Sequence, residues 1–346
     1  MAQNQRSSLT ERQTRIVDAV VVEHIVTAQP VGSKRLCEAH GFRCSPATIR
    51  SEMVRLEHRG YLQQPHTSAG RVPLGPAYRL HVDGLKKAHA RLNRQITWVQ
   101  GELRRLDAEP EVALRRTSDL LAQLTRYPAV VTRPYDPEGR PTRLTEVSLT
   151  PVSAQNVLFS FSDDQGHTFQ TIIEAKAPLK AKDVRTLEQA LCRLLVGRPP
   201  DTPLDLSELP AADEGVLAGI RKALDEASAG YVYVEGTRFM LDQPEFEQIE
   251  RLRRVMRTLS QSPLLLRLLQ SSTRPTSAGP VSVTIGSEHG VESLSDCSVV
   301  AAGYRGPGYS GGAVGVVGPM RMNYGLAMAA VACVARELGH TLHQRY

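Results

Sequence analysis

Apolar residues recur at helical spacing through the start of the chain and predict helices there. We expect helices over residues 9–28, 34–40 and 46–59. Thr10 and Gln13 have the spacing of a capping box at the start of the first helix. Ser33 is expected to cap the second helix, and Gly41 provides the turn before the third. The order of helix, tight turn and helix is that of a helix-turn-helix.

The third helix carries the clearest signals of the three. Ser45 is a favoured N-cap residue, Pro46 suits the first helical position, and Gly60 suits the left-handed position after the end. One apolar face is expected from Ile49, Met53 and Leu56. We therefore expect the opposite face to be open to solvent or to a partner.

A short hairpin is predicted directly after this helix. Residues 61–63 form its first strand, residues 72–73 lie on its return, and the small residues 67–70 allow a sharp bend between them. A solvated helix followed by a plain surface hairpin is the alternative. The direct succession of a helix-turn-helix and a hairpin favours a winged helix that binds DNA.

The outward face of the third helix and the hairpin supply the candidate DNA-binding residues. Arg50 has the chemistry to pair with guanine, Thr48 and Ser51 can bond several bases, and Arg55 is placed to contact phosphate. The hairpin residues can approach the backbone or a narrow minor groove. The complete predicted set is Ser45, Thr48, Arg50, Ser51, Arg55, His66, Thr67 and Arg71.

The pattern changes from helix to strand and back again in the rest of the chain. A helix is expected over residues 76–107, another over residues 112–124, and alternating strands from residue 144 to residue 173. Helices are expected over residues 182–196, 214–227, 246–259 and 263–270, with a strand over residues 231–234. Strands return over residues 281–285, 297–302 and 313–317, and a last helix covers residues 322–343.

Strands that are followed by helices and then by strands predict an α+β domain with a mainly helical insertion. We expect a winged-helix domain over residues 1–85 and a connector helix over residues 86–110. The α+β domain is then expected over residues 111–177 and 275–346, with the insertion over residues 178–274.

Positive charge is concentrated at the start of the chain. Residues 1–90 hold thirteen Lys and Arg against seven Asp and Glu, whereas the remainder holds 29 of each. The net charge of +6 therefore belongs to the part that carries the helix-turn-helix. Such a distribution is typical of a domain that binds a polyanion, joined to a neutral one.

Other classes of function find little support in the sequence. The five scattered cysteines form no disulfide framework, and the polar N-terminus and short apolar runs predict a cytoplasmic protein without a membrane partner. Cys37, His40 and Cys44 match no metal pattern, and residues 303–312 lack the Lys and Ser/Thr of a phosphate loop. We expect no catalytic residue, no metal and no cofactor, and hence no enzyme.

Several of these motifs resemble the family of the heat-inducible transcription repressor HrcA. The resemblance is carried by the following stretches: residues 9–13, Pro30 to Ser33, Ser45 to Arg50, Gly60 to Leu62, Gln64 to Arg71, Gln243 to Phe246, Asp296 to Ser298 and Gly318 to Met322 with Tyr324. The chain departs from the family pattern after Arg71, where Leu74, Gly75 and Pro76 precede Tyr78.

The resemblance implies a winged-helix domain, a GAF-like domain and an inserted dimerising domain. It implies a homodimer that binds double-stranded DNA at an inverted repeat, called CIRCE, upstream of class I heat-shock (chaperone) operons. It further implies a chaperonin that keeps the repressor active, release on heat stress, and association with the nucleoid when bound to DNA. A one-component regulator that senses a small molecule through the GAF-like domain is the alternative, and an enzyme tethered to DNA is another.

Overall fold

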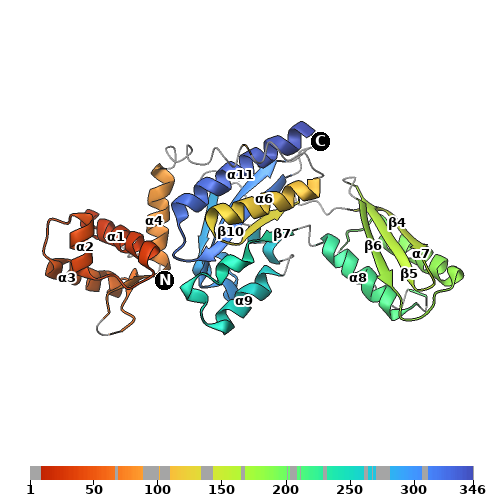
Figure 1. The fold of residues 1–346 in the computed structure, drawn as a ribbon, viewed down its shortest axis with the longest axis horizontal. Helices are drawn as coiled ribbons and strands as arrows, with labels where there is room; N and C mark the ends of the chain where they lie inside the picture. The colour runs from red at the N-terminus through yellow and green to blue at the C-terminus, as the bar shows by residue number, and fades with distance from the viewer. Residues whose placement is uncertain are drawn as a thin grey trace, which may run out of the picture.

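The computed structural model has three parts along its length (Figure 1). It describes residues 9–66, 69–88, 101, 110–133, 143–164, 168–200, 202, 209–210, 212–228, 232–260, 264–266, 268–269, 281–305 and 311–345. The N-terminal part contains three helices and a hairpin. The central part is built on a five-stranded sheet, and the third part on a separate three-stranded sheet.

The N-terminal part consists of the predicted helices and hairpin. Its elements are α1 (Glu11–Thr27), α2 (Ser33–His40), α3 (Pro46–His58), β1 (Leu62–Gln63) and β2 (Val72–Pro73). The capping box of Thr10 and Gln13 is confirmed, because each backbone N–H donates to the other residue's side chain at 3.2 Å. Ser33 does not cap α2 as predicted, since the cap is Gly32 and Ser33 is the first helical residue, which is buried.

The hairpin is held against the segment that follows α1. Val31 and Arg71 exchange backbone hydrogen bonds of 2.8 and 2.9 Å, which adds a third extended segment beside β2. A Cβ atom at Gly70 would lie 2.3 Å from the Val31 carbonyl oxygen. Only glycine fits there without moving the backbone, so the base of the hairpin has a fixed position.

The central sheet is antiparallel throughout and is covered on both faces. Its strand order is β7-β3-β10-β9-β8, with β3 (Ala129–Thr132), β7 (Val232–Glu235), β8 (Val281–Ile285), β9 (Cys297–Arg305) and β10 (Gly311–Pro319). One face, including Val131 and Val300, packs against α6 (Pro110–Thr125) and α11 (Tyr324–Arg345). The other face, including Val130 and Val299, packs against η3 (Thr237–Met240), η4 (Pro244–Phe246) and α9 (Ile249–Leu259). Two further short helices, η5 (Gly286–His289) and η6 (Glu292–Leu294), link β8 to β9.

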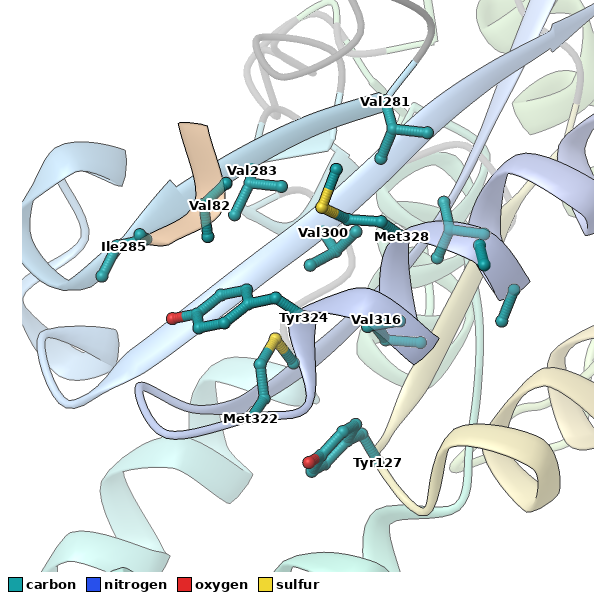
Figure 2. Packing of buried hydrophobic residues seen from close by; sticks show 14 of the residues in the cluster. Val82, Tyr127, Val281, Val283, Ile285, Val300, Val316, Met322, Tyr324 and Met328 are labelled. Carbon is teal, nitrogen blue, oxygen red and sulfur yellow. The ribbon is translucent and has the colours of Figure 1, made fainter. Parts of the chain in front are cut away.

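The helix α4 (Gly75–Ala88) carries the chain from the hairpin to the central part. Its residues Tyr78 and Val82 are buried among the residues that α11 and the sheet contribute, as Figure 2 shows for Val82 beside β8. The Tyr78 and Tyr324 rings lie 6.2 Å apart between centroids. The N-terminal and central parts therefore share one hydrophobic core.

The third part has a core of its own. The strands β4 (Leu144–Pro151), β5 (Asn156–Asp163) and β6 (Thr168–Glu174) form an antiparallel sheet in that order. One face of this sheet packs against α7 (Ala181–Leu195) and α8 (Glu214–Ser228) around Phe159 and Leu191. Figure 1 shows this part at the far side of the molecule from the N-terminal helices.

The boundaries of the insertion differ from those predicted. The three strands β4 to β6 belong to the insertion, and β7 and α9 belong to the central part, so the insertion lies between Arg133 and Val232 and is mixed α and β. Thr132 and Val232 are register partners in the central sheet, so the chain leaves and returns at one point. Alternation predicts that a segment is a strand but does not say which sheet it joins.

Most of the remaining elements follow the predictions, but the short helices η3, η5 and η6 were not predicted, and the helix expected over residues 263–270 lies partly outside the described residues. The short buried strand β3 was not predicted, because its four residues AVVT show no alternation. The predicted helix over residues 76–107 is seen as α4, and most of its second half lies outside the described residues. In the described part of the chain, no helix combines the length and the apolar character that crossing a membrane requires.

Candidate nucleic-acid interface

The helix α3 has one buried and one open face, as predicted. Ile49 and Leu56 are fully buried, whereas Arg50, Ser51 and Arg55 are exposed. Thr48 and Val54, which lie on the same outer arc, are half-buried. The structure therefore brings the predicted helix residues together on one accessible surface.

Ser45 and Thr48 are engaged with each other at the start of α3. The Ser45 hydroxyl accepts the Thr48 backbone N–H at 3.2 Å, and the two side-chain oxygens lie 3.0 Å apart. This arrangement satisfies one of the unpaired N–H groups of the first turn. The prediction of Ser45 as the N-cap is confirmed, and its side chain is committed to holding the first turn in place.

A buried carboxylate fixes α3 against α1. Glu52 is only 4% exposed and accepts hydrogen bonds from Gln13 Nε2 at 2.9 Å and from an Arg12 nitrogen at 2.8 Å. An Arg55 nitrogen lies 3.3 Å from the same carboxylate. The hydrogen bond from Gln13 is the main reason that the pKa of Glu52 lies below its usual value, with further help from Arg12 and Arg55.

The role of Glu52 was missed from the sequence. Its position, three residues after Ile49 and one before Met53, places a charged group on the apolar face of α3. A charge on a buried face requires partners, and that requirement is the signal that could have identified it.

The two arginines of the outer arc differ in their surroundings. Arg55 is 65% exposed at its side chain but is drawn toward Glu52. Arg50 is exposed, and among the described residues no carboxylate pairs with it. Because an unpaired guanidinium retains all its donors, Arg50 is the side chain best placed to bond a partner outside the chain.

The hairpin is braced by Glu57, which sits on the inner side of the end of α3. Its carboxylate accepts the Gln64 backbone N–H at 2.8 Å and pairs with an Arg71 nitrogen at 3.0 Å. The Gln64 side chain in turn donates to the Ala69 carbonyl oxygen at 3.1 Å. These bonds give the hairpin a defined orientation relative to α3.

Arg71 does not flank the hairpin tip as predicted. Its side chain is only 12% exposed and is paired with Glu57, because its backbone is fixed to Val31 at the base of the hairpin. His66 is exposed, and Thr67 lies outside the described residues. The structure therefore leaves His66 on the accessible surface and assigns Arg71 a place inside the fold.

The three residues considered as metal ligands are directed elsewhere. The Cys37 thiol donates to the Cys44 carbonyl oxygen at 3.6 Å, and His40 Nε2 lies 3.1 Å from a Glu23 oxygen. Glu23 also pairs with Arg35 at 2.8 Å, so these groups join α1 to α2. Within the described ranges, no group of His, Cys, Asp and Glu is arranged to hold a metal ion.

A cavity of about 240 Å³ lies in the third part, between β4, β5 and α7. Its lining is mainly apolar and includes Leu149, Val157 and Leu187, with Asp213 at one side. The Asp213 carboxylate accepts backbone N–H groups of Lys176, Ala177, Gly215 and Val216. That carboxylate thus has a structural role in closing the loop before α8.

Comparison with known proteins identifies relatives over the full length of the chain. Residues 111–328 match the family model described as the HrcA protein C terminal domain. A heat-inducible transcription repressor HrcA of Moorella thermoacetica is 32% identical, and the alignment covers 98% of this chain and 99% of that protein. The protein of the same description from Thermobifida fusca is 35% identical, with 97% and 98% covered.

One solved structure has a similar fold. It is a crystal structure of a protein described as hypothetical, with a TM-score of 0.63 and 24% identity. The alignment covers 97% of this chain and 99% of that one, so the similarity in fold extends over nearly the full length of both.

Proposed function

The chain belongs to the HrcA family of heat-inducible transcription repressors, and on this premise we propose that it represses transcription by binding double-stranded DNA through α3 and the hairpin. One observation carries the proposal. Arg50 is exposed and has no carboxylate partner among the described residues. It lies on a helix whose inner face is held in place by the hydrogen bond between Glu52 and Gln13. A rigid helix that presents such a group can read a base edge in the major groove.

The individual residues have different proposed roles. Arg50 bonds a guanine, Thr48 and Ser51 contact neighbouring bases, and Arg55 contacts phosphate. His66 and Thr67 approach the backbone from the hairpin. Ser45 and Arg71 support this surface from within, because their side chains are engaged with Thr48 and Glu57.

We further propose that a homodimer binds an inverted-repeat operator of the CIRCE type, upstream of class I heat-shock operons. One copy presents one α3 surface, and an inverted repeat offers two identical half-sites to a protein with two-fold symmetry. The third part is the proposed dimerising domain. This is supported by its separate core and by the outer strands β4 and β6, which lie at the two edges of the sheet as the structure describes it.

The proposed regulation is by chaperonin and heat. A chaperonin keeps the repressor folded in the cytoplasm, where it associates with the nucleoid when bound to DNA, and heat stress releases it from the operator. A loss of only about 1–2 kcal/mol in stability changes the active fraction several-fold, so a helper that refolds the chain has a large effect. A small-molecule sensor is the weaker proposal, because the cavity has an apolar lining and its carboxylate Asp213 is occupied by backbone N–H groups.

The test is the affinity of the full chain for a duplex carrying the inverted repeat against a scrambled duplex of equal length. We expect a clear preference for the operator, and we expect Arg50→Ala to weaken operator binding by about 1–3 kcal/mol with little effect on the scrambled duplex. Arg43→Ala, an exposed arginine in the turn before α3, is the matched control. Equal affinity of the wild-type chain for both duplexes would refute the proposed function.

A further inference from the structure

The helix α9 is a strongly basic element outside the N-terminal part. Its eleven residues, IERLRRVMRTL, contain four arginines and one glutamate. Val255, Thr258 and Leu259 are buried against the central sheet and η6. The rest of the chain after residue 90 holds equal numbers of basic and acidic residues. The helix α9 is therefore a local concentration of positive charge that the net charge of this region does not reveal.

All four arginines of α9 are exposed, and three of them share one arc of the helix. Arg253, Arg254 and Arg257 fall within one arc of the helix at spacings of one, three and four residues, and all three are exposed. Arg253 pairs with Glu250 at 3.1 Å, and Arg251 lies 3.9 Å from Asp296. In the part of the chain that the structure describes, Arg254 and Arg257 have no carboxylate partner.

The start of α9 lies close to the end of α1. Arg321 connects the two, because it donates to Glu245 Oε1 at 2.5 Å, to Gln243 Oε1 at 3.0 Å and to the Ile25 carbonyl oxygen at 3.4 Å. Glu245 belongs to η4, which directly precedes α9, and Ile25 belongs to the last turn of α1.

The base of the hairpin lies at this same end of α1. Val31, which follows the α1 C-cap residue Ala28, holds the hairpin through Arg71. Figure 1 shows α9 along the same edge of the molecule as the hairpin after α3. A duplex that lies against α3 and the hairpin would continue, past the hairpin, toward α9.

We propose that Arg254 and Arg257 of α9 form a second phosphate-binding surface, which contacts the backbone of the duplex just outside the half-site read by α3. This inference rests on the proposed function. Guanidinium groups without a competing carboxylate suit phosphate oxygens, and such contacts add affinity without adding base preference. The surface extends the positive charge of the N-terminal part rather than forming a separate site.

The experiment compares two duplexes that carry the same inverted repeat. One ends at the repeat, and the other extends about ten base pairs, or one helical turn, beyond each end. The wild-type chain is expected to bind the longer duplex more tightly. In the variant Arg254→Gln/Arg257→Gln this gain is lost, and the salt slope on the longer duplex falls by about 3.6 for the proposed homodimer, at about 0.9 for each of the four lost phosphate contacts.

Two further variants make the result specific. Arg185→Gln/Arg193→Gln removes the same charge from exposed positions on α7, in the third part, and should keep both the gain and the slope. Arg254→Lys/Arg257→Lys keeps the charge and should retain most of the slope. Thermal unfolding of each variant verifies that the fold is intact.

The possible failures are distinguishable. A wild-type chain that does not prefer the operator over a scrambled duplex overturns the proposed function as a whole. A wild-type chain that prefers the operator, with an α9 variant that keeps its flank gain and salt slope, overturns only this inference and leaves the arginines of α9 to an acidic protein partner.

Discussion

The N-terminal part and the third part are both small units of helices and a short sheet, yet they are attached to the central part in different ways. The N-terminal part continues into the central core through α4, whereas the third part closes its own core and leaves the central sheet at a single point. The two attachments have different consequences for how a disturbance in the central part spreads.

The N-terminal attachment is made by both apolar and polar contacts. Tyr78 is 2% exposed and lies beside Tyr324. The Tyr324 hydroxyl donates to the Met320 carbonyl oxygen at 2.6 Å and lies 2.8 Å from the Ser298 hydroxyl. Burial raises the pKa of both tyrosines far above the usual range, so both hydroxyls stay protonated. The orientation of α3 relative to the central sheet is thus set by a packed interface.

Among the described residues, few contacts join the third part to the central part. A described contact between them is Arg133, at the end of β3, whose guanidinium carbon lies 5.8 Å from the centre of the Phe169 ring on β6. A cation–π contact of this kind contributes about 0.5–1 kcal/mol at an exposed site. We therefore expect a disturbance in the central core to reach the proposed DNA-binding surface, and one in the third part to stay local.

The largest expected effect comes from removing one large buried side chain on each side of this comparison. Tyr324→Ala and Phe159→Ala should each lower the free energy of unfolding by about 3–5 kcal/mol, because each ring is fully buried. Hydrogen exchange should rise in α1, α4 and the central sheet for Tyr324→Ala. For Phe159→Ala, it should rise in β4 to β6, α7 and α8 alone. Faster exchange in α1 of the Phe159 variant would contradict the separation.

The division of the chain into an N-terminal part, a central part and an inserted third part could be predicted from the sequence only in part. The helices of the N-terminal part were predictable because caps and apolar faces are local signals, as Thr10, Ser45 and Gly60 demonstrate. The insertion was misplaced because the pairing of β3 with β7 joins residues about one hundred positions apart, with no local signal for it. Sheet membership is a property of tertiary packing.

The candidate site, like the fold, could be predicted from the sequence only in part. Arg50, Ser51 and Arg55 could be placed on the outer face of α3 because helical spacing determines which residues share a face. Arg71 could not be placed, because its partners Glu57 and Val31 come from other elements. A side chain's exposure depends on which distant groups bind it, and spacing along the chain contains no such information.

An intermediate effect is expected inside the N-terminal part, at Glu52. Glu52→Gln keeps the shape but removes the charge that Gln13 and Arg12 bond, and it should cost about 1–3 kcal/mol. The folded state lowers the pKa of Glu52, so its contribution is complete above the unfolded pKa of about 4.3 and is lost as pH falls below it. The free energy of unfolding should therefore fall less steeply between pH 6 and pH 3, by urea denaturation, in Glu52→Gln than in the wild type.

Glu250→Gln is the control for this measurement. Glu250 is 82% exposed at its side chain and pairs with its neighbour Arg253 on α9, so its loss should change stability by less than about 0.5 kcal/mol. A Glu52 variant with the pH dependence of the wild type would show that another carboxylate governs the acid limb.

The smallest expected effect tests whether the N-terminal attachment orients the proposed DNA-binding surface. Arg79 on α4 donates to the Val283 carbonyl oxygen at 2.7 Å, on the free edge of β8, and pairs with Glu288. The Arg79 side chain is 27% exposed, and Glu288 would still accept the Ile285 backbone N–H at 2.9 Å in the variant. We therefore expect Arg79→Gln to lower the free energy of unfolding by only about 1 kcal/mol. Its affinity for a single half-site should be unchanged, whereas affinity for the inverted repeat should fall several-fold, because two half-sites require a fixed orientation of both surfaces.

Arg115→Gln, which removes the exposed pair with Glu235 away from this junction, should leave both affinities unchanged. An equal loss on both duplexes for Arg79→Gln would mean that the residue contributes to the binding surface and not to its orientation.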